Sequence, residues 1–199
     1  SGRVTPLQAW RFLIILCLIG LFVLLQFNWL TIALGVASLV LVAIYTFMKR
    51  VTYWPQFFLG LTLNWGALMG YSAIANQIDA AALALYAAGL FWTLGYDTIY
   101  AHQDKEDDAL IGVKSSALKL GRHTRTALVV FYASTLICLA LAGGFANMQT
   151  LYWAGLAITA YHLFMQIMRL NIDNPDTCLR IFRANRDTGL IIAGTILLG

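Results

Sequence analysis

Charged residues are scarce in this sequence of 199 residues. Only 11% of them are Asp, Glu, Lys or Arg, whereas 60% are hydrophobic. A soluble globular domain carries roughly 25% charged residues, so this chain has too few to cover a surface that faces water. The composition excludes a soluble globular domain and predicts a membrane protein.

Cysteine is also rare and provides no metal or disulfide framework. Cys17, Cys138 and Cys178 lie far apart without CxxC or CxxH spacing, and we interpret them as ordinary apolar or loop residues. The alternation over about ten residues that is typical of a transmembrane β-barrel is absent. No basic stripe with interleaved aromatics appears, so we expect no nucleic-acid partner. Apolar runs of about 20 residues recur instead, which predicts an all-α, polytopic transmembrane bundle in a lipid bilayer.

The apolar runs predict about seven spans. We expect helices at about 7–26, 30–48, 56–75, 80–102, 125–144, 150–169 and 188–199, within one membrane domain over residues 1–199. The last reaches only about 18 Å at about 1.5 Å per residue, short of a hydrocarbon core of about 30 Å. We therefore expect that the chain continues past Gly199 or that this helix is partly inserted. Because the chain opens with Ser1 and no signal peptide precedes the first apolar run, we expect an internal piece of a longer protein.

Lys and Arg residues occupy alternate connections between these helices. All thirteen lie near the start of the chain or after the second, fourth and sixth helices, and the connections near 26–28, 76–79 and 143–150 have none. This alternation follows the positive-inside rule. It predicts that Ser1 and the basic loops face the cytoplasm or the matrix.

The stretch YDTIYAHQDKEDD, at 96–108, holds five of the nine acidic residues. If one helix persists through it, Asp97, Asp104 and Asp108 share one face over about three turns, and Tyr100 flanks that face. Like charges on one face repel, and charge near lipid is costly and normally functional. Carboxylates without a His or Cys cluster suit Mg²⁺ or Mn²⁺, and Mg²⁺ shares its remaining positions with waters and substrate phosphates. The stretch therefore predicts a metal site for a lipid diphosphate, with a solvated acidic loop as the alternative.

Basic residues on the same side of the membrane are candidates to bind the diphosphate. YTFMKRVTYWPQ, at 45–56, supplies Lys49 and Arg50, and IGVKSSALKLGRHT, at 111–124, supplies Lys114, Ser115, Ser116 and Lys119. An Arg fork binds phosphate or carboxylate bidentately, and Lys acts as a point charge. We interpret Arg122, Arg125 and the basic residues at 169–186 as topological charges.

These stretches resemble one known family. YDTIYAHQDKEDDALIGVKSSALKLG is similar to the second aspartate-rich motif of the UbiA-type aromatic prenyltransferases, and YTFMKRVTYWPQFFLG and NRDTGL resemble segments of the members that act on 4-hydroxybenzoate in ubiquinone synthesis. The resemblance covers essentially the whole chain and implies a nine-span bundle around a central cavity. It also implies two facing aspartate-rich motifs that bind Mg²⁺ and a polyprenyl diphosphate. The first motif, NDxxDxxxD, is absent here, so the resemblance implies that two helices and half of the metal site are missing.

The resemblance implies Mg²⁺-dependent transfer of a polyprenyl group from polyprenyl diphosphate to the ring of 4-hydroxybenzoate, in a bacterial or mitochondrial inner membrane. We expect Asp97, Asp104 and Arg50 to be catalytic and Asp97, Asp104 and Asp108 to bind the metal. We expect the substrates to be bound by Lys49, Arg50, Lys114, Ser115 and Tyr100. The alternatives are a prenyltransferase with another aromatic or tetrapyrrole acceptor, a fragment that needs the missing helices in trans, and a divalent-cation transporter. A transporter is expected to hold its carboxylates near the bilayer midplane.

Overall fold

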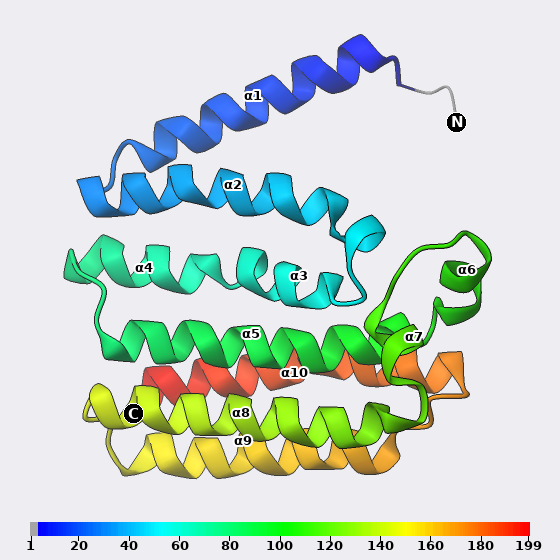
Figure 1. Ribbon diagram of the computed structural model, residues 1–199. Coiled ribbons are helices and arrows are strands. Elements are labelled where there is room, and N and C mark those ends of the chain that lie inside the picture. Colours follow the sequence, from blue (N-terminus) through cyan, green and yellow to red (C-terminus); the bar gives the residue numbers. More distant parts are fainter. Residues whose placement is uncertain (1–3) are drawn as a thin grey trace.

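The computed structural model describes residues 4–199, and all regular elements in this range are helices. Seven long rods lie side by side (Figure 1), one of them made of two consecutive helices: α1 (Pro6–Leu24), α2 (Trp29–Val51), α3 (Pro55–Leu63) with α4 (Trp65–Ala75), α5 (Ala80–Ala101), α8 (Thr124–Phe145), α9 (Thr150–Arg169) and α10 (Pro175–Leu198). Two short helices, α6 (Lys105–Leu110) and α7 (Ser116–Leu120), and a 3-10 turn at Gly121–His123 connect α5 to α8. The all-α fold class is confirmed.

Length and composition identify the membrane-crossing part. Four segments are long and apolar enough to span a bilayer, namely Pro6–Leu24, Trp29–Val51, Pro55–Ala75 and Ser116–Phe145. Helices α5, α9 and α10 have comparable lengths of 22, 20 and 24 residues, about 30 to 36 Å at the helical rise. Large apolar side chains are exposed along the bundle, most of all on α1, which has no buried residue. Such a surface is stable against lipid, and the chain is an integral membrane protein.

The last helix is longer than the sequence predicted. We expected it at 188–199, but α10 begins at Pro175 and continues for 24 residues. Proline at the first turn and the Asn174 side chain, which accepts a hydrogen bond from the Thr177 N–H at 2.9 Å, fix its start. The basic residues that suggested a loop are Arg180, Arg183 and Arg186, and all three lie on exposed parts of this helix. The prediction of a final helix too short to span was therefore wrong.

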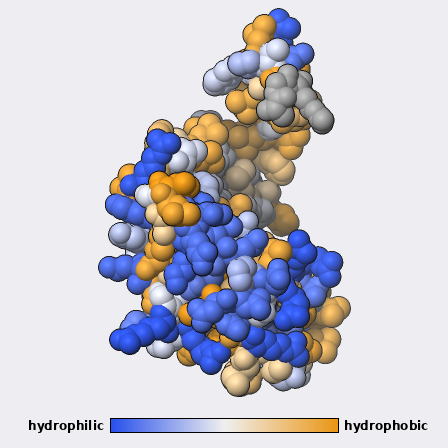
Figure 2. Space-filling view, turned by 90° about the vertical axis from the view of Figure 1, so that its right-hand side faces the viewer, coloured by the Kyte–Doolittle hydropathy of each residue, from blue (hydrophilic) through white to orange (hydrophobic). Residues whose placement is uncertain are grey.

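The basic connections meet at one end of the bundle. Figure 1 places the start of α1, the end of α2, helices α6 and α7, and the connection from α9 to α10 at this end. Figure 2 looks onto it and shows hydrophilic residues gathered over its middle and lower parts, with the outline hollowed on one side below α1. The predicted alternation of connections with and without Lys and Arg is confirmed for the described residues, and Ser1 and Arg3 lie outside them. The compartment that this end faces stays a prediction.

A buried core holds the basic end of α5 in place. Its residues come from α5, α8, α9 and α10 and are Ile99, Leu128, Tyr132, Leu163, Ile167, Leu170, Cys178 and Ile181. Tyr132 on α8 is 2% exposed, and its hydroxyl donates to Oε1 of Gln166 on α9 at 2.9 Å. This packing makes the last turns of α5 a rigid support for the residues that follow.

Candidate active site

Asp97 lies one turn before the end of α5, at the basic end of the bundle. Its neighbour Thr98 is fully buried, and the Thr98 hydroxyl lies 2.8 Å from the Ser116 hydroxyl on α7. The charge of Asp97 interacts with the ammonium group of Lys49 on α2 and, with opposite sign, with the carboxylate of Asp104. The charges of Lys49 on α2 and of Asp104 at the start of α6 therefore both act on the Asp97 carboxylate, although Lys49 forms no ion pair with it within 4.0 Å in the described residues.

The three aspartates do not share one helical face. Helix α5 ends at Ala101, and His102 and Gln103 form a turn. Asp104 directly precedes α6, and its side chain makes no capping hydrogen bond. Glu106, Asp107 and Asp108 occupy the first turn of α6, where the positive end of the helix dipole stabilises carboxylates. If α5 had continued through this stretch, the same carboxylates would lie at its C-terminus, where the negative end of the helix dipole disfavours them. The prediction of one persistent helix was wrong for this reason.

Only part of the predicted metal set fits a bound Mg²⁺ ion. Within residues 4–199, no three His, Cys, Asp or Glu side chains come close enough together to hold a metal, so the structure shows no three-carboxylate cage. Mg²⁺ commonly uses one or two carboxylates and completes its octahedron with water and phosphate oxygens. The charges of Asp97 and Asp104 repel each other, and a bound cation would offset that repulsion. Binding of Mg²⁺ by these two residues stays a prediction. Asp108 is 9% exposed on α6, and its role as a ligand stays a prediction.

The loop between α6 and α7 is attached to the end of α2. The Lys114 N–H donates to the Lys49 carbonyl at 3.0 Å, and Lys114 Nζ donates to the Val51 carbonyl at 3.1 Å. Nζ also lies 5.5 Å from the centre of the Tyr53 ring, and Lys119 Nζ lies 5.8 Å from the same ring. These contacts gather predicted substrate-binding cations around the last carbonyls of α2, where positive charge is favourable. Lys49 and Arg50 remain exposed there and accessible to a ligand.

Ser115 and Tyr100 have structural contacts of their own. Ser115 is 2% exposed and caps α7, accepting a hydrogen bond from the Leu118 N–H at 3.5 Å. Tyr100 packs against Phe182 of α10 with 4.6 Å between ring centroids. Binding of substrate by either residue stays a prediction.

An aromatic cavity that the sequence did not predict lies between α5 and α10. It has a volume of about 540 Å³ and is lined by Trp92, Tyr96, Phe182, Arg183, Asn185 and Arg186. The indole N–H of Trp92 donates to Oδ1 of Asn185 at 2.9 Å, which connects α5 to α10. Arg183 and Arg186 had been interpreted as topological charges, yet they reach this cavity. Their spacing of three residues indicates a common helix face, and it was overlooked because the helix was expected to begin at 188.

His102 has no role as a charged group at this site. It is 4% exposed, and its Nε2 lies 2.8 Å from the Thr124 hydroxyl. Burial, reinforced by the nearby charge of Lys105, lowers its pKa to about 4, against a smaller opposite effect of Asp173. The imidazole is therefore neutral near pH 7, and it joins the end of α5 to the start of α8.

Replacing Lys114 by Met is expected to raise the KM for a diphosphate substrate by about tenfold. The variant loses a cation and the hydrogen bond to Val51 but keeps an unbranched apolar side chain. Steady-state kinetics in membranes measure the effect, and Lys105→Met removes a charge from α6 as a control. An unchanged KM in the Lys114 variant would show that this cation only fastens the loop.

Comparison with known proteins agrees with this geometry. A sequence profile of the UbiA prenyltransferase family matches residues 1–188. The chain belongs to this family. Two solved structures share the fold over nearly the whole chain: a UbiA homolog from Aeropyrum pernix K1, with a TM-score of 0.80 at 22% identity over 99% of this chain and 74% of that one, and a digeranylgeranylglyceryl phosphate synthase, with a TM-score of 0.76 at 18% identity over 100% and 71%.

Curated relatives in this family are more similar in sequence. Proteins named mitochondrial 4-hydroxybenzoate polyprenyltransferase are 48% identical in Drosophila melanogaster, 46% in Homo sapiens and 46% in Arabidopsis thaliana, in each case over 100% of this chain. The match covers 51%, 54% and 49% of those proteins, so the chain spans about half the length of the curated relatives it matches.

Proposed function

We propose that this UbiA-family chain takes part in Mg²⁺-dependent transfer of a polyprenyl group from polyprenyl diphosphate to the ring of 4-hydroxybenzoate. The observation that carries the proposal is the position of the half-buried Asp97 at the basic end of a membrane bundle, where the charges of Lys49 and Asp104 act on its carboxylate. The curated relatives named for this reaction support the choice of acceptor. The inner membrane of a bacterium or mitochondrion is the proposed location, with the site on the cytoplasmic or matrix side.

The carboxylates and cations bind the diphosphate in this proposal. Asp97 and Asp104 would hold Mg²⁺, which neutralises the charge that develops on the departing diphosphate. Lys49 and Arg50 approach from the end of α2 and supply donors to the phosphate oxygens. Because these groups are fixed beside lipid, where the effective dielectric constant is low, they stabilise the separating charge more than exposed cations in water would.

In this proposal the aromatic cavity holds the allylic carbon, which is the other end of the C–O bond that breaks. Tyr96 lies between Trp92 and Phe182, with ring centroids 5.4 and 5.8 Å away. Their ring faces stabilise the allylic cation that forms as its C–O bond to the diphosphate breaks. A ring carbon of the acceptor then forms a bond to the allylic carbon, and the proton on that ring carbon passes to a base.

Within this proposal Arg50 binds either the carboxylate of the acceptor or the diphosphate, and kinetics of Arg50 variants distinguish these two roles. If its guanidinium binds the acceptor carboxylate bidentately, Arg50→Gln is expected to raise the KM for 4-hydroxybenzoate about tenfold or more and leave that for polyprenyl diphosphate nearly unchanged. Arg50→Lys is expected to recover only part of the loss, since an ammonium makes no fork. A rise in the diphosphate KM alone would assign Arg50 to the diphosphate instead.

Product analysis tests the function itself. Membranes that contain the protein are incubated with polyprenyl diphosphate, Mg²⁺ and either 4-hydroxybenzoate or homogentisate, and prenylated products are identified by mass spectrometry. Prenylated 4-hydroxybenzoate is the expected product. Product from homogentisate alone would move the proposal to a different acceptor, and absence of any prenylated product would contradict it.

A further inference from the structure

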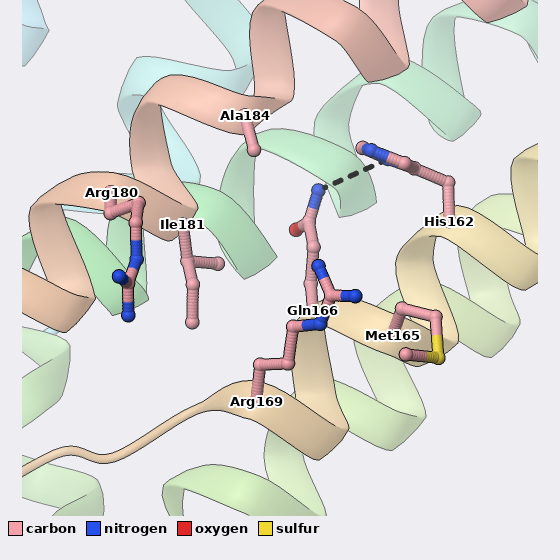
Figure 3. Close-up of a pocket in the computed structure, with 7 residues that line it drawn as sticks. All are labelled: His162, Met165, Gln166, Arg169, Arg180, Ile181 and Ala184. Carbon is pink, nitrogen blue, oxygen red and sulfur yellow. Dashed lines mark hydrogen bonds between the residues drawn. The ribbon is translucent and has the colours of Figure 1, made fainter.

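A second cavity lies between α9 and α10 at the basic end of the bundle. Its volume is about 510 Å³, and its lining residues are His162, Met165, Gln166, Arg169, Arg180, Ile181 and Ala184. None of them lines the aromatic cavity between α5 and α10. Figure 3 shows Arg169 of α9 and Arg180 of α10 toward one end of the cavity, Gln166 between the helices, and His162 farther along α9 from Arg169.

The two guanidinium groups have no carboxylate partner. In the part of the chain that the structure describes, the one ion pair within 4.0 Å joins Arg186 to Asp187. Arg169 and Arg180 are exposed, and two like charges around a single cavity repel each other. An anion between Arg169 and Arg180 would remove that repulsion and accept several charge-assisted hydrogen bonds.

The inner part of the cavity is already satisfied. Gln166 is 4% exposed, its Nε2 donates to the Thr188 hydroxyl at 3.0 Å, and its Oε1 accepts from Tyr132. His162 Nδ1 lies 2.9 Å from the same Thr188 hydroxyl. Among the polar lining residues, only the two arginines therefore have no hydrogen-bond or ion-pair partner in the described residues.

The remaining lining and its surroundings are apolar. Met165, Ile181 and Ala184 complete the cavity wall. The neighbouring outer surface of α9 exposes Tyr161 at 66%, Phe164 at 55% and Met168 at 58%. A ligand that fits this site carries an anionic group at one end and a hydrocarbon chain at the other.

We propose that this cavity binds the headgroup phosphate of an anionic phospholipid between Arg169 and Arg180, with an acyl chain against Met165 and Ala184. Basic pockets between transmembrane helices on the cytoplasmic or matrix side are suited to such headgroups. The site is separate from the proposed prenyl-transfer site, and it would fasten the α9–α10 pair to the anionic leaflet.

Lipid binding to the purified protein tests the proposal. Native mass spectrometry compares dioleoyl phosphatidylglycerol with dioleoyl phosphatidylcholine, which has no net charge. The wild-type protein is expected to prefer phosphatidylglycerol, and Arg169→Gln with Arg180→Gln to weaken that binding about 25-fold, about fivefold for each guanidinium. Arg169→Lys with Arg180→Lys keeps both charges and is expected to retain most of the preference.

Two further variants separate the cavity from general surface charge. Arg11→Gln with Arg122→Gln removes two exposed charges from the same end and is expected to leave the preference unchanged. Ala184→Trp fills the cavity, keeps both arginines and is expected to weaken phosphatidylglycerol binding as well. An equal loss in the Arg11/Arg122 control, or full binding by the Ala184 variant, would overturn the proposal.

A soluble anion is the alternative occupant. If sn-glycerol 3-phosphate at the concentration of the lipid displaces phosphatidylglycerol, the cavity binds a free phosphate and the lipid assignment is wrong. No displacement is expected, because the soluble compound lacks the chain that contacts Met165 and Ala184.

Discussion

Replacing Asp97 by Asn is expected to lower the rate of prenyl transfer at least about a hundredfold. Asparagine has nearly the same shape, so the half-buried position on α5 is still filled. The variant loses the negative charge that interacts with Lys49 and that, in the proposed mechanism, holds Mg²⁺. The measurement is product formation at saturating substrates over a series of Mg²⁺ concentrations. Higher Mg²⁺ is expected to restore part of the activity, since Asp104 remains.

A matched substitution at Asp176 shows whether the lower rate is specific to Asp97. Asp176 lies in the first turn of α10 at the same end of the bundle and is exposed. Asp176→Asn removes an equal charge from that end and is expected to keep the rate within about twofold, because only a weak helix-dipole interaction is lost. If Asp97→Asn were as active as this control, the assignment of Asp97 to the metal would be wrong.

The sequence predicted the bundle well because its signals are local. Long apolar runs and the alternation of basic loops depend on composition within each segment, and both reappear as the helices and the basic end of Figure 1. The start of α10 was missed because charge density suggested a loop. Pro175 preceded by Asn174, a known start signal for helices, would have corrected it.

The residues assigned to the site stay a prediction, and their geometry was anticipated only in part. The acidic stretch and the Lys49–Arg50 pair could be recognised by residue type, but the turn at His102 and Gln103 breaks the assumed periodicity. The cavity formed by Trp92, Tyr96 and Phe182 depends on how α10 packs against α5. Such long-range packing leaves no periodic signal in either helix.

Replacing Gly95 by Ala is expected to destabilise the protein by about 1 to 3 kcal/mol. Gly95 faces α8, and an added methyl group would overlap the ring of Tyr132. The ring cannot move aside easily, because it is 2% exposed and its hydroxyl is held by Gln166. In a helix, alanine is more stable than glycine by about 1 kcal/mol. The observed decrease in the free energy of unfolding is therefore the cost of the steric overlap minus that gain. Thermal unfolding in detergent measures it.

Gly70 on α4 provides the control, since an added Cβ there meets nothing within 4 Å. Gly70→Ala is expected to raise the melting temperature slightly through helix propensity alone. Replacing Tyr132 by Leu in the Gly95→Ala background is expected to recover part of the loss from the overlap. Because Gly95 lies two residues before Asp97, a shift of α5 away from α8 also displaces the carboxylate from Lys49, and prenyl transfer is expected to fall with stability. If Gly95→Ala instead raises the melting temperature as Gly70→Ala does, contact between α5 and α8 is not what holds Asp97 in place.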